Sequence, residues 1–321
     1  MQRIIGHLHL EGSVPTDFLA KIAERNALPG HVNLFRAYRP RRFASFEAFS
    51  RLIVATAQAL RTRTDVLQAG LLLGERLRND GVLYAEILWV PQLYNTAAID
   101  LDGILEALNE ARDRILTRYG IEMNWIVDLV RGYPKQGEQV MRWLQGFDPR
   151  SRHIVAVGLG GNETHPLSDM QALLLSARDL GIEIYPHSGE QCGPDQVEEV
   201  ITVLAPRRIA HGIRAAERES TLQIIRSEGI HLDICPTSNL ALRVYGNLRD
   251  LPIPKLIAAQ CAFSINTDDP ALLGIDLEFE IRQCMQVHGL TAGSLQQMYR
   301  NAAAATFLGP EDKTDLCRRL A

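Results

Sequence analysis

Short segments rich in β-branched and aromatic residues alternate with stretches of helical periodicity, and this alternation most limits what the chain can fold into. Parallel strands need crossover connections of a dozen residues or more, which the chain provides, so we predict a parallel sheet with helices outside. Eight such units over about 250 residues or more predict a closed (β/α)8 TIM barrel, an α/β fold. The predicted strands are residues 4–9, 82–89, 123–130, 154–159, 182–187, 208–211, 231–235 and 262–267.

The segment between the first two predicted strands is too long for one crossover helix. Residues 14–80 predict a helical insertion that covers one mouth of the barrel, with helices at 16–25, 46–60 and 64–79. An open, doubly wound sheet is the alternative fold, but no G-x-G-x-x-G follows the first strand. Because no linker or composition break divides the chain, we expect one domain over residues 1–321.

Composition limits the partners of the chain. The 34 Lys+Arg and 38 Asp+Glu residues give a net charge of −4, which argues against binding to a phosphate backbone of nucleic acid. No apolar run reaches the roughly 20 residues of a membrane-spanning helix. The first residues lack the apolar segment of a secretory signal, so we expect a cytoplasmic protein. Five scattered cysteines argue against a disulfide framework, and the oligomeric state is left open.

Histidine and acidic residues gather at the ends of the predicted strands. The first strand ends in a His-x-His pair, His7 and His9, whose side chains project to the same face. His187, His211 and Asp268 end the fifth, sixth and eighth strands. Barrel enzymes carry their catalytic groups at the carboxyl ends of the strands, so we expect these side chains to meet. Converging buried imidazoles predict a bound metal ion.

The residue types at these strand ends suit a hydrolytic reaction. Three histidines and one aspartate offer nitrogen and oxygen ligands with a position left open for water, as zinc requires for catalysis. Water bound to zinc ionises near neutral pH and can attack an sp² carbon. Such a reaction needs a proton donor, and Glu190 stands three residues after His187. Asp268 and Asp269 are adjacent, so one can face the metal and the other the substrate.

Six strings resemble, in order, the motifs of the adenosine deaminase family, which contains metal-dependent deaminases of adenosine, adenine and modified adenosines in the amidohydrolase superfamily. As an ordered set they are far more specific than any single string. The resemblance implies a hydrolase of purine metabolism that replaces a 6-amino group by oxygen and releases ammonia. The strings are HLHLEGS (7–13), GLGGNE (158–163), HSGE (187–190), RIAHG (208–212), CPTSN (235–239) and SINTDDP (264–270).

The resemblance also implies a role for each matching residue. Glu190 would protonate the purine at N1, and His211 would orient the attacking water and stabilise the alkoxide. The implied zinc ion, one per chain, could be replaced by another divalent metal. The implied binding residues are His7, His9, His187 and Asp268 for the metal, Asp269 for purine N7, the backbone N–H of Gly161 for N3, and Glu11 for a ribose.

Departures from the family pattern concern the substrate. Gly158 replaces an aspartate of the best-known nucleoside enzymes, and Glu11 is one methylene longer than the usual aspartate. The GLGGNE string and Gly193-Pro194 resemble bacterial branches that act on adenine or modified nucleosides. We therefore expect the small-molecule partner to be a purine nucleoside or base. Adenosine or a related nucleoside comes first, with adenine or an aminodeoxyfutalosine-type nucleoside as alternatives.

Two more distant functions remain as hypotheses. An amide or ester hydrolase could use the same metal scaffold, and a barrel could bind purines or a protein partner without turnover. The complete ligand set and Glu190 disfavour a non-catalytic barrel. We expect Glu86 to be a buried structural residue, Cys235 to shape a loop, and Phe43, Phe46 and Phe49 to pack in the core or a lid. Histidines expected at the surface or in loops are His31, His153, His165, His231 and His288.

Overall fold

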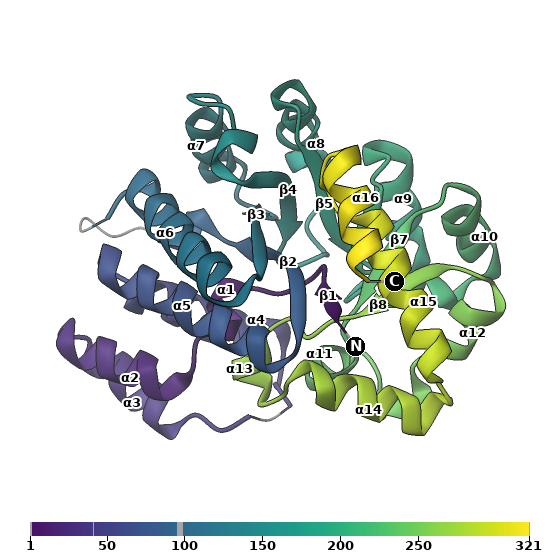
Figure 1. Cartoon of the computed structure of the whole chain (residues 1–321), viewed down its shortest axis with the longest axis horizontal. Coiled ribbons are helices and arrows are strands. Elements are labelled where there is room, and N and C mark those ends of the chain that lie inside the picture. The colour runs from purple at the N-terminus through teal and green to yellow at the C-terminus, as the bar shows by residue number, and fades with distance from the viewer. Residues whose placement is uncertain (1, 41, 95–98, 321) are drawn as a thin grey trace.

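The computed structural model describes residues 2–40, 42–94 and 99–320. Its eight strands run parallel in the order β1 to β8, each paired with the next, which confirms the predicted (β/α)8 barrel (Figure 1). The strands are β1 (Arg3–Ile5), β2 (Val82–Trp89), β3 (Glu122–Val130), β4 (Ile154–Gly160), β5 (Glu183–Ser188), β6 (Arg208–His211), β7 (His231–Ile234) and β8 (Ala262–Ile265).

Two isolated backbone bridges follow β1 at the carboxyl side of the barrel, one to the segment after β8 and one to β2. Leu8 pairs with Asp268, and His9 pairs with Leu88. The backbone N–H of His9 also donates to the carbonyl oxygen of Asp268 at 2.9 Å. The first and last strand ends are therefore held together at the mouth where the predicted site residues lie.

The first strand is shorter than predicted. It ends at Ile5, so the expectation of a strand over residues 4–9 is wrong beyond that position. The physical reason is a side chain: Asn266 Oδ1 accepts the backbone N–H groups of Gly6 and His7, at 2.9 and 3.1 Å. An amide from the end of β8 thus replaces the strand-to-strand hydrogen bonds and redirects the chain into the mouth.

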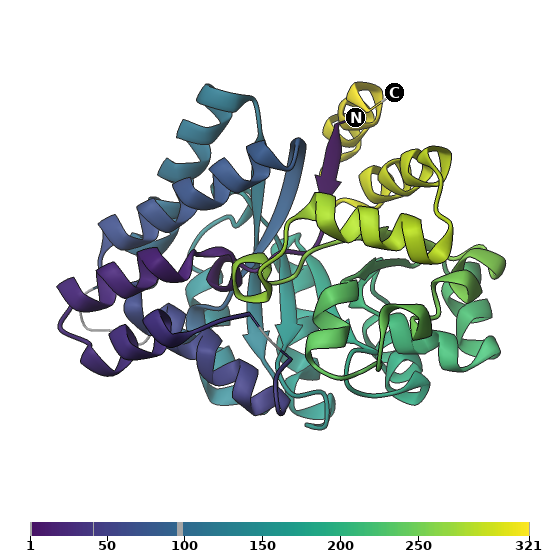
Figure 2. The ribbon, with the colours of Figure 1, turned by 90° about the horizontal axis from the view of Figure 1, so that it is seen from below.

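Helices surround the strands and form the predicted insertion, α1 to α5, which lies on one side of the barrel in Figures 1 and 2. The prediction missed α3, which lies between the predicted helices at 16–25 and 46–60. The α-helices are α1 (Leu10–Ser13), α2 (Thr16–Arg25), α3 (Pro29–Ala37), α4 (Phe46–Ala59), α5 (Arg63–Asn79), α6 (Leu101–Tyr119), α7 (Pro134–Leu144), α8 (Ser168–Ser176), α9 (Pro194–Leu204), α10 (Glu219–Ser227), α11 (Pro236–Ala241), α12 (Ile253–Ala258), α13 (Pro270–Leu273), α14 (Leu277–His288), α15 (Ala292–Ala305) and α16 (Pro310–Arg319). Short 3-10 helices are η1 (Pro91–Leu93), η2 (Arg150–Arg152), η3 (Ala177–Leu180), η4 (Ile213–Glu217) and η5 (Leu248–Asp250).

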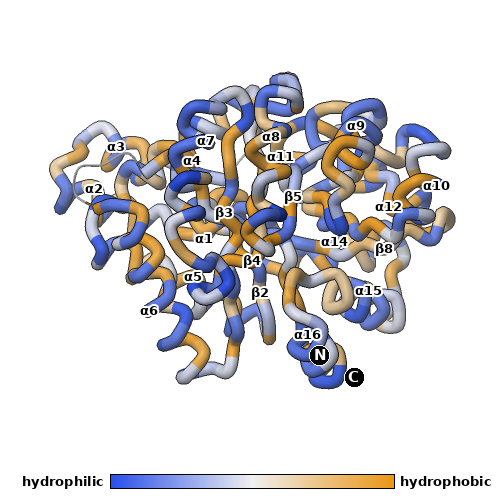
Figure 3. Tube along the Cα trace, turned by 90° about the horizontal axis from the view of Figure 1, so that it is seen from above, coloured by the Kyte–Doolittle hydropathy of each residue, from blue (hydrophilic) through white to orange (hydrophobic). Residues whose placement is uncertain are grey.

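The core lies inside the barrel and between the strands and the helices. Every residue of β2 and of β4 is buried, as expected for parallel strands covered on both faces. Hydrophobic segments follow the central strands in Figure 3, whereas α16 is largely hydrophilic. Among the described residues, none of the helices combines the length and the apolar character needed to cross a membrane.

The helical segment formed by α8 and η3 ends at Gly181, which adopts a φ of 68° that favours glycine. The prediction that His231 is a surface or loop histidine is wrong, because it begins β7 and is 2% exposed. The hydroxyl of Ser264 lies 3.0 Å from its Nε2, so the buried ring has a polar partner.

Candidate active site

The side chains of His7, His9, His187 and Asp268 meet at the carboxyl end of the barrel. His7 Nε2 lies 3.2 Å from Asp268 Oδ1, and His9 Nε2 lies 3.5 Å from the same oxygen. His9 Nε2 also lies 3.2 Å from His187 Nε2. His7, His9 and His187 form one group whose potential ligand atoms lie within 4.8 Å of one another, and Asp268 approaches this group through His7 and His9. The four side chains therefore meet at the same mouth of the barrel, as the sequence predicts.

Burial and neighbouring charges favour the metal-binding protonation states of His9, His187 and Asp268. Burial lowers the pKa of His9 to about 3 and holds the pKa of His187 well below its usual range. Burial alone would raise the pKa of Asp268, but its hydrogen bond to His7 and the nearby histidines hold it well below the usual range. Neutral imidazoles and an ionised carboxylate are the forms that bind metals. The donor set fits a divalent metal ion.

A second group of potential ligand atoms includes Cys235 together with His7, His211 and Asp268. Burial raises the pKa of the Cys235 thiol well above its usual range, whereas the thiolate is the form that binds metals. Its Sγ donates instead to the carbonyl oxygen of Asp233 at 3.7 Å. Cys235 is therefore a poorer ligand than the histidines.

Two of the residues at the mouth have an unfavourable backbone conformation. His211 and Asp268 both have a φ of 61°, in the left-handed region that side chains other than glycine rarely adopt. Each such residue costs about 1–3 kcal/mol, and such residues cluster at functional sites. The surrounding barrel holds both side chains in positions that an unconstrained strand end would not adopt.

Glu190 and His211 face each other beside the potential ligands. His211 Nε2 lies 3.6 Å from Glu190 Oε1 and 3.8 Å from Asp268 Oδ2. Burial, with the charge of Asp268, raises the pKa of Glu190 well above its usual range. The surroundings of Glu190 therefore favour its protonated form, which is the form that a general acid needs.

The loop that carries Glu190 is held by a buried carboxylate, Glu163. Its two oxygens accept the backbone N–H groups of Glu190, Gln191 and Cys192, at 3.1, 3.0 and 2.6 Å. The predicted site did not include Glu163. The GLGGNE string, which contains Glu163, was a signal for this residue in the sequence. Its hydrogen-bond partners lie 27 to 29 positions further along the chain, so the sequence alone did not reveal them.

Asp269 and Gly161 lie on the wall of the same mouth. Burial and the charge of Asp268 raise the pKa of Asp269 well above its usual range, and its Oδ1 has no hydrogen-bond partner among the described residues. A Cβ at Gly12 would overlap with the Asp269 carboxyl group, which explains a glycine in the HLHLEGS string. Gly161 has a φ of 95° and follows β4.

Glu11 lies behind this wall. It is fully buried, and its Oε1 accepts the backbone N–H of Val90 at 3.0 Å. Glu11 does not line the cavity of the mouth, although Val90 does. The ribose contact expected for Glu11 stays a prediction.

The mouth contains a cavity of about 630 Å³. It extends from His9, His187 and Asp268 to the inner face of α4, so the insertion covers one mouth of the barrel. Phe46 and Phe49 line it, in the lid position expected for them, and Phe43 is buried next to Phe49. The polar and charged lining residues are His9, Glu47, Ser50, Arg51, Gln58, Gln92, Asp128, Arg131, Tyr133, Gln136, Asn162, His165, His187, Glu190, His211, Asp268 and Asp269.

The wall residues that were not predicted include Asp128 and Arg131, both near the end of β3. Arg131 is 1% exposed and donates to the carbonyl oxygens of His187 and His165, at 3.1 and 3.4 Å. Burial, with the charges of Glu11 and Asp268, raises the pKa of Asp128 well above its usual range. The third strand carries no recognisable string, so only the barrel geometry reveals these residues.

Tyr185 connects His7 to a buried ion-pair network. Its hydroxyl lies 2.9 Å from His7 Nδ1 and donates to Asp233 Oδ2 at 2.8 Å. Arg208 forms ion pairs with both Asp233 and Glu86, inside the barrel. Glu86 is fully buried, as expected, and its contact with Arg208 agrees with the predicted structural role. Histidines that bind metals need such a partner on the second ring nitrogen, because it sets their orientation and tautomer.

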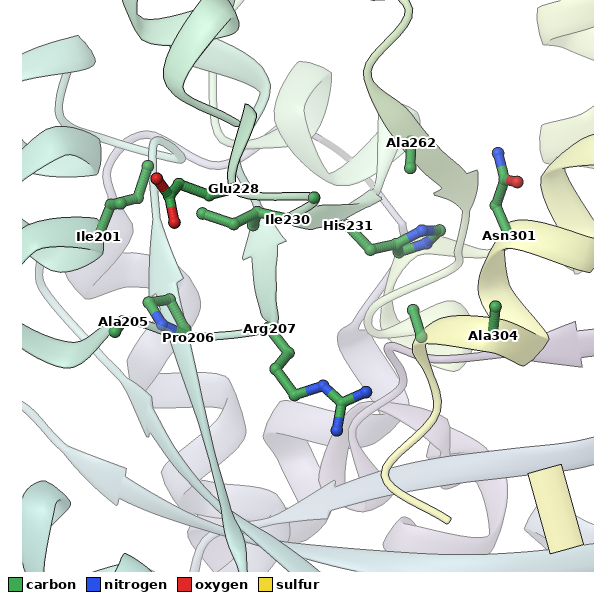
Figure 4. A pocket seen from close by; sticks show the side chains of 12 residues that line it. Ile201, Ala205, Pro206, Arg207, Glu228, Ile230, His231, Ala262, Asn301 and Ala304 are labelled. Carbon is green, nitrogen blue, oxygen red and sulfur yellow. The ribbon is translucent and has the colours of Figure 1, made fainter. Parts of the chain in front are cut away.

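A second cavity, of about 480 Å³, lies at the other end of the barrel, beside the amino-terminal ends of β6, β7 and β8 (Figure 4). Arg207, Glu228, His231 and Asn301 enter it from different elements. Its lining brings together one histidine and one carboxylate, and it contains none of the predicted site residues. The functional site is therefore assigned to the mouth.

Comparisons with known proteins agree with this geometry. The family model for adenosine deaminase matches residues 3–321. The chain belongs to the adenosine deaminase family. It is 30% identical to an adenine deaminase of Rhodospirillum rubrum over 98% of this chain and 94% of that protein. It is 33% identical to an aminodeoxyfutalosine deaminase of Acidothermus cellulolyticus over 85% of this chain and 79% of that protein.

A solved structure shares the architecture of this family member. The adenine deaminase of Arthrobacter aurescens superposes with a TM-score of 0.90 and 25% identity, and the match covers 99% of this chain and 97% of that one. The family and these relatives identify the chain as a hydrolytic deaminase, and hydrolytic deamination of an aminopurine is the reaction that they support. The prediction of an enzyme is confirmed.

Proposed function

We propose that this deaminase removes the 6-amino group of a purine nucleoside, adenosine or a relative of it, as ammonia and leaves the 6-oxo product. The observation that carries the proposal is the single cavity that begins at the four potential metal ligands and Glu190 and extends beneath α4. Its volume of about 630 Å³ lies in the range of pockets that hold molecules larger than a bare base.

His7, His9, His187 and Asp268 would hold one divalent metal ion, which we propose to be zinc because the ligands are nitrogen and carboxylate oxygen. The metal would supply Lewis-acid activation of the attacking water. His211, within 4 Å of both Asp268 and Glu190, would orient that water and stabilise the alkoxide that forms.

The remaining residues of the wall would recognise the purine. Glu190, whose pKa is raised, would donate a proton to ring atom N1 as the tetrahedral centre forms at C6. The raised pKa of Asp269 favours its protonated form, which would donate a hydrogen bond to N7. The backbone N–H of Gly161 would face N3.

Free adenine is the second candidate substrate. It is favoured because Glu11, the expected sugar contact, bonds to Val90 behind the wall and does not line the cavity. The adenine deaminases among the relatives agree with this alternative.

Ammonia release from a panel of substrates tests the proposal. The panel contains adenosine, adenine, adenosines with bulky 5′ substituents, and simple esters. We expect the highest kcat/KM with a nucleoside, plain or 5′-substituted. Turnover of adenine with no turnover of nucleosides would favour the second candidate. Turnover of esters alone would contradict both.

A further inference from the structure

Asp128 is a buried carboxyl group without a partner in the wall of the cavity. It is 2% exposed and lines the cavity at the end of β3. Its Oδ1 has no hydrogen-bond partner in the described part of the chain, and no ion pair of Asp128 is found there. An unpaired buried carboxyl group is costly, so its presence points to a partner that arrives with the substrate.

The adjacent strand leaves room for this carboxyl group. Asp128 pairs in register with Gly158 of β4. A Cβ at position 158 would clash with Oδ1 of Asp128, and a Cβ at position 160 would lie 2.5 Å from its Oδ2. Two glycines on β4 therefore allow the Asp128 side chain to fill the space beside the mouth.

The strand order indicates which part of the substrate reaches Asp128. In the proposed function, N1 of the purine faces Glu190 after β5, N3 faces Gly161 after β4, and N7 faces Asp269 after β8. Around the barrel, β3 follows β4 in the direction away from β5. Around the purine, N9 follows N3 in the direction away from N1. The N9 side of the purine therefore faces the end of β3.

Three other polar side chains near this side are less available than Asp128. Glu11 accepts a hydrogen bond from Val90 through one oxygen, and although its other oxygen has no partner among the described residues, the side chain does not line the cavity. Gln92 accepts the backbone N–H of Val130 at 2.7 Å and donates to the carbonyl oxygen of Tyr133 at 3.3 Å. His9 belongs to the proposed metal ligands. Asp128 is left as the carboxyl group available to this side of the substrate.

We propose that Asp128 accepts a hydrogen bond from a hydroxyl group of the sugar on N9 and thereby selects nucleosides that carry it. This inference rests on the proposed function, because it uses the orientation of the purine given there. A nucleoside that lacks the hydroxyl would leave the buried carboxyl group unpaired, which strongly disfavours such an analogue. Asp128 would take the position in recognition that the sequence assigns to Glu11.

The test measures kcat/KM for adenosine and for its 2′-deoxy, 3′-deoxy and 5′-deoxy analogues. In the unmodified enzyme, we expect at least one deoxy analogue to react about 10- to 100-fold less efficiently than adenosine. In Asp128→Leu, which keeps a similar volume without an acceptor, this difference should shrink to about threefold or less. The substitution should lower kcat/KM for adenosine and leave kcat/KM for the affected deoxy analogue unchanged.

Two further variants keep the test decisive. Asp128→Ala removes the carboxyl group without adding bulk, so it replaces the leucine variant if that one does not fold, and the same loss of discrimination is expected. Asp80→Asn is the matched control, since Asp80 is 5% exposed and lies between α5 and β2 at the opposite end of the barrel. It should leave the ratios among the four nucleosides unchanged.

The possible failures separate the inference from the function. If nucleosides are turned over and the unmodified enzyme treats all four alike, or if the difference persists in both Asp128 variants, the role of Asp128 is refuted and the proposed function stands. If the unmodified enzyme deaminates adenine and refuses every nucleoside, the proposed substrate is wrong, and the inference is refuted with it.

Discussion

Burial determines the protonation state of the key side chains at the mouth of this barrel. The pKa values of Glu190 and Asp269 are raised because their carboxyl groups are removed from water next to the charge of Asp268. His9 and His187 are kept neutral by the same loss of hydration. One site thereby contains proton donors and metal ligands in their working forms.

Glu190→Gln should lower kcat by roughly 100- to 10,000-fold, because the side chain can no longer give a proton to the purine. The metal content, measured by elemental analysis, should not change. In the unmodified enzyme, kcat should fall as the pH rises through the raised pKa of Glu190, since only the protonated form is a donor. The variant should lack this alkaline decline. Glu228→Gln changes an exposed carboxylate in the same way and is the control, which should keep full activity. Full activity in Glu190→Gln as well would show that Glu190 is not the proton donor.

Tyr185→Phe should weaken metal binding about 10- to 100-fold, because His7 loses the hydroxyl that orients its ring. Competition with a chromogenic chelator measures the affinity directly. Tyr84→Phe is the matched control, as Tyr84 is equally buried and donates to Glu86 rather than to a ligand. Equal losses in the two variants would mean that a general loosening of the buried network, and not the contact with His7, weakens the site.

Among the secondary-structure elements, the insertion depends on the start of α5. Thr62 and Asp65 form a capping box there, and Asp65 also accepts from Asn26 at 3.0 Å and pairs with Arg25 at the end of α2. One fully buried carboxylate thus ends one helix and begins another. The helices at 16–25 and 64–79 were predictable from periodicity, but this link between them was not.

Asp65→Ala should reduce the free energy of unfolding by about 2 kcal/mol, through the lost cap, the lost hydrogen bonds to this buried carboxylate and the lost ion pair with the partly exposed Arg25. Thermal unfolding followed by circular dichroism gives the change. Because Asp65 does not line the cavity, kcat/KM of the folded enzyme at 25 °C should stay within about twofold of its original value. The exposed Asp113→Ala offers a control that should change neither quantity. A large loss of kcat/KM would indicate that the insertion controls the mouth.

For the whole molecule, the proposed metal joins residues from the first, fifth and last strands. Removal by a chelator should abolish deamination and lower the melting temperature, since a ligand that binds only the native state stabilises it. Zinc should restore both properties at one ion per chain. Deaminase activity in a preparation shown by elemental analysis to be free of metal would contradict the proposed site.

Alternating strand and helix periods, together with motifs at the strand ends, were sufficient to predict the barrel, the insertion and the four converging side chains. That prediction succeeded because parallel connections force all the strand ends to one face, so His7, His187 and Asp268 had to lie near each other. The length of β1 was not predictable, because the strand-to-strand hydrogen bonds beyond Ile5 are replaced by a hydrogen bond to Asn266, which lies 260 positions from Gly6 in the sequence. Asp128 and Tyr185 likewise became apparent only in the folded chain, because hydrogen bonding and burial depend on neighbours that the linear sequence does not bring together. Local periodicity thus determined the architecture, and tertiary contacts decided the protonation and partners of the residues within it.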